Sequence, residues 1–378
     1  MEFFARNNIT ILGLVVTLLC TPLAAQAVSW PMLQGSEEKA FKKGKKAPFM
    51  KVWGFVQPLY MFQNEGPYAP LRKKGGDNSF LIRRTRVGIR GSVTDRVNYF
   101  FLSEFGDNGI TRKTGAVSLT DASISIKLAD GLRIRMGQFK VPFGIDGLQA
   151  IHRHIFINFS QAASQMLLRP DRNFAKYTGE KGAQLVHAYR DIGIQAFDQI
   201  KVGPGAITYA VGLFNGSGIN RTDNNKKKDV IGKLQYDWMS GALKGLEIGA
   251  SYANGKHTAD ELEYTRWGVE LQFDRGPVHL MAEYMAGKDE QKDGAADIED
   301  KGWYVAAGYD IVPKRLRADV RYDVFEPDKE NADYNRTTLG LMYFFKGWNR
   351  FTLNYEIIDD EANPDRDSAV GAQFTIIF

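Results

Sequence analysis

The chain has 378 residues, of which 44% are hydrophobic, with a mean hydropathy of −0.31 and a formal net charge of +5. After Ala27 no apolar run approaches the roughly 20 residues of a transmembrane helix, which excludes a helical membrane protein. The single cysteine, Cys20, lies in a segment predicted to be removed, so disulfides, thiolate metal sites and c-type haem attachment are excluded, and we expect no metal and no cofactor.

Residues 1–27 have the pattern of a signal peptide. Arg6 precedes an apolar run from Ile9 to Leu19, and small residues end the segment before a predicted cleavage after Ala27. Residues 28–49 show no strand pattern and carry a lysine-rich run at 42–46. They predict a basic periplasmic segment that leads into a single domain at residues 50–378.

From residue 50 onward the chain alternates polar and apolar side chains, which is the period of a β-strand. Polar Arg317, Asp319 and Arg321, for example, alternate with apolar Ala318 and Val320. About sixteen such strands are predicted. They begin near Met50, Phe80, Val97, Val117, Leu132, Asp191, Ala206, Asp229, Leu246, Tyr264, Val278, Gly302, Arg315, Asn335, Arg350 and Ser368.

The connections between these strands alternate between tight turns and longer polar loops, and aromatic clusters such as 343–345 lie at strand ends. Short periplasmic turns, long external loops and aromatic girdles are typical of bacterial outer-membrane barrels. A soluble β-sandwich would share the alternation but not this rhythm. The sequence therefore predicts an all-β fold, a transmembrane antiparallel β-barrel in the outer membrane of a Gram-negative bacterium.

Basic residues gather on the polar face of the predicted second strand. Arg84, Arg86 and Arg90 share that face, whereas Arg83 has the opposite parity and is predicted to lie at the membrane interface. Most acidic residues on polar faces belong to later strands. We therefore expect the early strands to carry a cationic part of the channel wall.

The fifth strand adds Arg133 and Arg135 to this wall. After Gly137 the parity slips, and Lys140 would face lipid unless a bulge at Gly137 resets the register. A lysine on the lipid face at mid-membrane costs about 2–4 kcal/mol. Lys140 is therefore predicted to lie in the lumen.

Residues 145–190 form a connection too long to be passive. We expect this loop, after strand 5, to fold inward and narrow the channel. It is net basic, and Arg169 and Arg172 are its candidate contributions to an anion path.

The last strand ends on Phe378, with Phe374 and Ile376 on the same apolar face. Among outer-membrane proteins generally, a terminal aromatic residue on the lipid face implies recognition by the barrel assembly machinery. Phe378 is therefore the candidate assembly signal, and outer-membrane lipid is the expected surrounding.

Four strings resemble the phosphate-selective porin O/P family in order and spacing. They are RRTRVGIRG at 83–91, GQFKVPFG at 137–144, YRDIGIQ at 189–195 and YAVGLFNG at 209–216. The resemblance implies a homotrimer of sixteen-stranded barrels, each a water-filled channel that favours anions such as phosphate. It also implies that the early-strand arginines and Lys140 line the anion path. The loop after Phe143 lacks the form of the best-known phosphate channels, so anion preference carries over more safely than phosphate specificity.

Other functions are compatible with a barrel. A general diffusion porin with weak selectivity and a sleeve that holds a protein partner are the alternatives. An enzyme is not expected, because the chain has neither G-x-S-x-G nor H-E-x-x-H, and its histidines are scattered. No nucleic-acid partner is expected. The leading prediction is a passive porin for phosphate or similar anions.

Overall fold

The computed structural model of the protein describes residues 47–63, 77–106, 117–167, 189–223, 225–257, 262–291, 294–328, 332–361, 364 and 368–378. The predicted signal peptide, most of residues 28–49, and the loop residues Arg169 and Arg172 lie outside this part of the chain. Over the residues that are described, no helix is long and apolar enough to cross a membrane.

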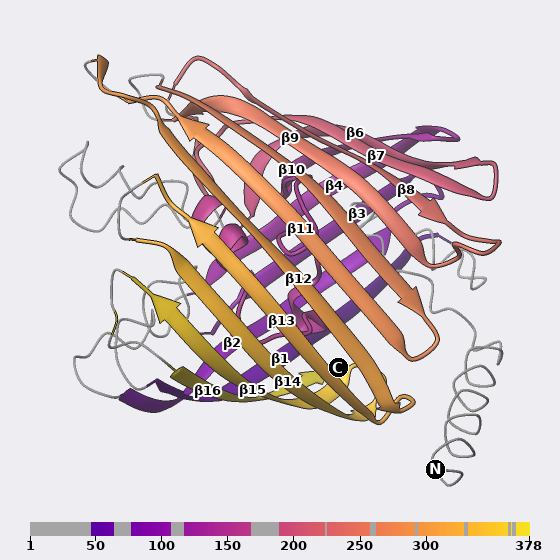
Figure 1. Ribbon diagram of the computed structural model, residues 1–378. Coiled ribbons are helices and arrows are strands. Elements are labelled where there is room, and N and C mark those ends of the chain that lie inside the picture. The colour runs from indigo at the N-terminus through magenta and orange to yellow at the C-terminus, as the bar shows by residue number, and fades with distance from the viewer. Residues whose placement is uncertain are drawn as a thin grey trace, which may run out of the picture.

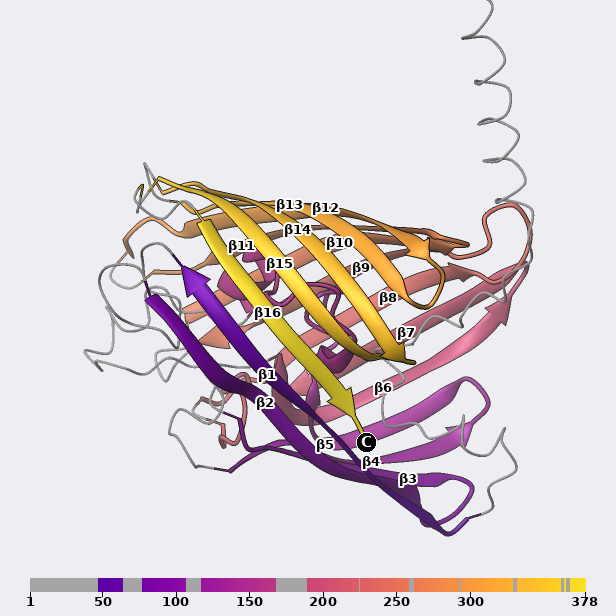
Figure 2. The same cartoon turned by 90° about the horizontal axis from the view of Figure 1, so that it is seen from below.

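Sixteen antiparallel strands in the described residues form one closed barrel, in which β1 pairs with β16 (Figure 1; Figure 2). This confirms the predicted fold class. The strands are β1 Phe49–Gln63, β2 Asp77–Ser92, β3 Val97–Glu104, β4 Ser118–Ala129, β5 Leu132–Lys140, β6 Arg190–Val202, β7 Gly205–Phe214, β8 Asp229–Trp238, β9 Leu246–His257, β10 Leu262–Arg275, β11 Val278–Asp289, β12 Ile298–Val312, β13 Leu316–Glu326, β14 Tyr334–Lys346, β15 Asn349–Asp360 and β16 Ser368–Ile377.

Each strand has one face toward the lumen and one toward the outside, because successive side chains point in opposite directions. On β15, Arg350 and Asn354 are each 1% exposed, whereas Leu353 and Tyr355 are 40% and 44% exposed. Apolar side chains thus cover the outside, and polar side chains fill the inside. Such a surface suits a lipid environment and a polar interior.

A β-bulge changes the predicted place of Arg83. The register shifts between Gln57 and Pro58, and Pro58 lies opposite Ile82, which leaves Arg83 as the extra residue of β2. Proline has no N–H to donate, so the ladder is interrupted there. Arg83 donates from Nη2 to the side-chain oxygen of Asn158 at 3.0 Å, inside the barrel. The prediction that Arg83 lies at the outer interface is therefore wrong.

The predicted bulge at Gly137 is also absent from the described ladders. β5 pairs with β6 in continuous register through Gly137 to Lys140, and β4 pairs with β5 without a shift at Gly137. Gly137 has a φ of 126°, which favours glycine. Lys140 is the last residue of β5, where the chain leaves the wall, and its ammonium group turns into the lumen without a bulge.

Candidate channel site

The chain that follows β5 turns into the barrel (Figure 1). Residues 141–167 include the short helices η1 Ile151–Arg153 and η2 Ala163–Leu167. Phe143 and Leu148 are 2% exposed and Ile157 is 3% exposed, although all three belong to a connection between strands. For the described part, the structure confirms that this loop folds inward. We call residues 141–167 the lumen loop.

Polar side chains on the far wall hold the backbone amides of the lumen loop. The carboxylate of Glu283 on β11 accepts hydrogen bonds from the N–H groups of Ile145 at 3.0 Å and Asp146 at 3.2 Å. On β15, Asn354 Oδ1 accepts the Ile157 N–H at 2.7 Å. Buried amides without such partners would each cost about 1–3 kcal/mol. These hydrogen bonds from the wall therefore replace the ones that the loop amides would make with water.

Lys140 holds the beginning of the loop from the near wall. Its Nζ donates to the backbone oxygens of Gly147 at 2.9 Å, Leu148 at 3.2 Å and Gln149 at 2.6 Å. The side chain is only 8% exposed. An ammonium group has three donors, and here three loop carbonyls receive them. This geometry makes Lys140 an anchor of the lumen loop.

The two central arginines of β2 are buried in the lumen beside the loop. Arg86 donates from Nε to Glu104 Oε2 at 2.7 Å, and Arg84 donates from Nη1 to Gln57 Oε1 at 3.2 Å. The Arg84 guanidinium lies 5.9 Å from the ring centroid of Phe159 in the lumen loop. Glu104 offsets much of the Arg86 charge, and the acceptor of the Arg84 hydrogen bond is the neutral Gln57 amide.

The arginines of β5 repeat this arrangement. Arg133 forms an ion pair with Asp198 on β6. Arg135 donates from Nε to Ser125 Oγ at 3.2 Å, and its guanidinium lies 4.4 Å from the Phe197 ring centroid. The hydroxyl and the aromatic face orient the guanidinium, and the carboxylate of Asp121 is close enough to act on its charge.

Arg190 and Arg336 are among the charged groups of the lumen that the sequence analysis did not place there. Arg190 begins β6 and donates from Nε to Asp121 at 2.9 Å, whereas the sequence placed it at the end of the loop. Arg336 on β14 bonds Asp323 at 3.1 Å and Glu356 at 3.4 Å. The alternation along β14 was the signal that would have placed Arg336 inside.

Carboxylates dominate the opposite part of the wall, on β8 to β11. Asp237, Glu247, Glu270 and Glu283 are all at most 6% exposed and face inward. Glu270 is paired with Lys233. Buried arginines thus lie on β2 and β5 and again on β13 to β15, where carboxylates accompany them, whereas carboxylates outnumber the buried bases on β8 to β11. The sequence-predicted residues that the structure places on the inner side are Arg84, Arg86, Arg90, Arg133, Arg135 and Lys140.

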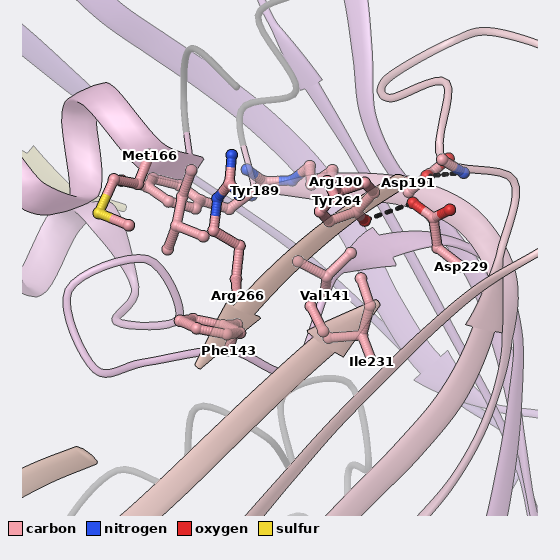
Figure 3. Close-up of a pocket in the computed structure, with 13 residues that line it drawn as sticks. Val141, Phe143, Met166, Tyr189, Arg190, Asp191, Asp229, Ile231, Tyr264 and Arg266 are labelled. Carbon is pink, nitrogen blue, oxygen red and sulfur yellow. Dashed lines mark hydrogen bonds between the residues drawn. The ribbon is translucent and has the colours of Figure 1, made fainter. Parts of the chain in front are cut away.

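A cavity of about 70 Å³ separates the lumen loop from part of the wall (Figure 3). Phe143 and Met166 of the loop line one side of it, and Ile231 and Tyr264 line another. Tyr264 donates its hydroxyl to Asp229 Oδ2 at 2.5 Å. The lining thus mixes apolar side chains with the charged groups of Arg190, Asp191, Asp229 and Arg266, two of each sign.

Comparison with known proteins gives the same architecture. Residues 63–374 match the family model described as phosphate-selective porin O and P. An uncharacterised protein of Aquifex aeolicus is 24% identical to this chain. The alignment is 399 residues long and covers 88% of each of the two chains.

Two solved structures share the fold. An anion-selective porin from Comamonas acidovorans is 14% identical, with a TM-score of 0.63 over 87% of this chain and 98% of that one. The trimer form of the outer-membrane protein OmpT of Vibrio cholerae is 14% identical, with a TM-score of 0.58 over 88% of this chain and 100% of that one.

Proposed function

The chain belongs to the phosphate-selective porin O and P family and is an outer-membrane porin, and we propose that its channel prefers small anions, with phosphate or similar oxyanions as substrates. The observation that carries this proposal is the set of buried arginines on β2 and β5 beside the lumen loop. Within this set, Arg84 bonds the neutral amide of Gln57, and Arg135 bonds the hydroxyl of Ser125.

The magnitude of the effect is sufficient for selectivity. An anion about 4 Å from a guanidinium gains roughly 4 kcal/mol at an effective dielectric constant near 20, and less where water screens the pair. Several such groups offset part of an anion's dehydration as it passes the loop. The anion path of this proposal consists of Arg84, Arg86, Arg90, Arg133 and Arg135. Arg169 and Arg172 stay candidates outside the described residues, and Lys140 acts through the loop that it anchors.

A second candidate function is general diffusion with weak selectivity. The inward carboxylates Asp237, Glu247 and Glu270 favour it, because they offset the arginines in the total charge of the lumen. A sleeve around a protein partner is disfavoured, since the lumen loop already occupies the interior through its bonds to Glu283 and Asn354.

Planar-bilayer recordings distinguish the two candidates. We expect chloride current through the purified protein to be blocked progressively by phosphate and less strongly by sulfate, with a reversal potential on the anion side. Equal permeability of potassium and chloride without block by phosphate would favour general diffusion and overturn the proposal.

We also propose that the protein is a homotrimer in the outer membrane, inserted by the barrel assembly machinery. The trimer form of the Vibrio cholerae relative supports this assembly. In mild detergent, the unboiled protein should migrate at trimer mass and shift to monomer mass on boiling. An unboiled species at monomer mass would contradict the trimer.

A further inference from the structure

One side chain of the lumen loop joins two strands that lie on either side of the barrel's seam, where β1 pairs with β16. Asn158 is 7% exposed, and both ends of its amide have a partner. Its Oδ1 accepts a hydrogen bond from Arg83 Nη2 on β2 at 3.0 Å, and its Nδ2 donates to Glu356 Oε1 on β15 at 2.9 Å. In the barrel, β16 and β1 lie between β15 and β2. Asn158 therefore spans the seam from the inside, and we call these three residues the Asn158 clamp.

Arg83 takes part in the clamp because of the bulge in β2. In a regular strand, neighbouring residues such as Arg83 and Arg84 point to opposite faces. The register shift between Gln57 and Pro58 leaves Arg83 as the extra residue, and both arginines then find partners inside the barrel. A bulge that re-aims a side chain is a recurrent feature beside functional sites. The bulge therefore supplies one half of the clamp.

Ile157, the residue before Asn158, packs on the seam itself. Its side chain lies in a buried cluster with Leu59 and Met61 of β1. On β16, a Cβ atom at Gly371 would lie 2.9 Å from the Ile157 Cδ1 atom, which is closer than real Cβ contacts come. The glycine thus leaves the space that Ile157 fills. Residues 157 and 158 therefore lie directly against the inner wall at the seam.

Phe159, the residue after Asn158, touches the proposed anion path. Its backbone oxygen accepts a hydrogen bond from Arg336 Nη2 at 2.6 Å. Its ring centroid lies 5.9 Å from the guanidinium carbon of Arg84 and 4.6 Å from the ring centroid of His154. A guanidinium within about 6 Å of an aromatic centroid is attracted to the ring face. A displacement of Asn158 would move Phe159, and with it one of the contacts that orient Arg84.

The amide of Asn158 matches its two partners in chemistry. An amide oxygen can only accept and an amide nitrogen can only donate, so the oxygen suits the cation Arg83 and the nitrogen suits the anion Glu356. Each hydrogen bond has one charged partner, which makes it stronger than a bond between two neutral groups. Leucine has a similar shape but neither function, and aspartate has only acceptors.

We propose that Arg83 and Glu356 are positioning residues that act through Asn158. Together they hold residues 157–159 across the seam and thereby fix the orientation of Arg84 in the anion path. In this role neither Arg83 nor Glu356 needs to contact the permeating ion. The inference rests on the proposed anion channel, because anion selectivity is the property that the clamp serves.

The test compares variants of the full protein in planar bilayers. Asn158→Leu removes both hydrogen bonds of the clamp and leaves the charge of the lumen unchanged. Gln373→Leu is the matched control, because it removes a buried amide on β16 that has no hydrogen bond to the lumen loop in the described part of the chain. Asn158→Asp combined with Glu356→Gln exchanges donor and acceptor and keeps the natural net charge.

Two quantities are measured, the reversal potential in a KCl gradient and the rate of current fluctuations. A heat-shifted band on gels confirms that each variant is folded. If Asn158→Leu does not assemble, Asn158→Ser, whose side chain is too short to reach both partners, takes its place.

Asn158→Leu should raise the rate of fluctuations about tenfold, as expected for the loss of a charge-assisted hydrogen bond, and should shift the reversal potential toward cations. Gln373→Leu should resemble the natural protein. Asn158→Asp alone should disturb both quantities, because it places two carboxylates together. The added Glu356→Gln should recover most of the natural behaviour, since glutamine can donate to the new carboxylate.

Three results would overturn the clamp. They are equal behaviour of Asn158→Leu and Gln373→Leu, faster fluctuations without any shift of the reversal potential, and a double variant no better than Asn158→Asp alone. In each case a natural protein that stays anion-selective would leave the channel function standing. A natural protein without anion preference would overturn the proposed function itself.

Discussion

The ring of Phe378 covers Gly54, so that a Cβ atom at Gly54 would lie 2.6 Å from the Phe378 Cζ atom. The same residues close the barrel. The Phe378 N–H donates to the Gly54 oxygen and the Gly54 N–H donates to the Phe378 oxygen, each at 3.0 Å. Phe378 therefore extends the hydrogen-bonded pairing of β1 with β16, which closes the barrel.

Deletion of Phe378 should lower the assembled fraction of the protein, because the seam loses two ladder hydrogen bonds and its apolar cover. Channels that do assemble should keep their conductance, since Phe378 lies outside the lumen and is 63% exposed. The ratio of heat-shifted to unshifted band in outer-membrane fractions measures assembly. Tyr355→Ala, which removes an outward aromatic side chain away from the seam, is the control. Normal assembly of the deletion would count against this role.

Glu283→Ala should loosen the lumen loop. It removes the acceptor of two buried amides, at Ile145 and Asp146, and weakens docking by about 2 kcal/mol or more. Single-channel records should show noisier and larger currents than those of the natural protein. Glu299→Ala, at an exposed position of β12, should leave the records unchanged. Identical records for the two variants would show that Glu283 does not hold the loop.

Acid should also weaken loop docking, through His152. Its pKa is about 3 in the docked loop, whereas a released, hydrated histidine titrates near 6.5. The released state therefore binds more protons, and docking loses stability as the pH falls from about 6.5 toward 3, by about 3 kcal/mol at pH ~4.5. Burial raises the pKa of Asp146, which opposes part of this loss.

Current noise should consequently increase between neutral pH and pH ~4.5 in the natural protein. His152→Gln cannot take up the proton and should reduce this dependence, whereas His154, whose pKa burial also lowers, still contributes in the same direction. The slope of noise against pH is the quantity to compare, because the substitution also changes packing against Trp53. Equal slopes in the two proteins would rule out His152 as the titrating group.

Much of the barrel could be predicted from the sequence, because polar and apolar side chains alternate along each strand, and this pattern is visible in a short stretch of sequence. The bulge at Pro58 could not, since it depends on how two strands pair. The docking of the lumen loop could not either: Ile157 finds its acceptor on Asn354, far along the chain, and no local pattern joins them. The anchoring contacts of Lys140 likewise depend on the folded loop.

The central claim, that buried arginines on β2 and β5 make the channel prefer anions, is tested most directly by the reversal potential in a KCl gradient. The natural protein should be anion-selective. Arg84→Gln combined with Arg135→Gln should shift the potential toward cations. The same charge change at exposed turns, Arg96→Gln with Arg315→Gln, should shift it much less. Equal shifts for the two double variants, or a natural channel without anion preference, would contradict the account.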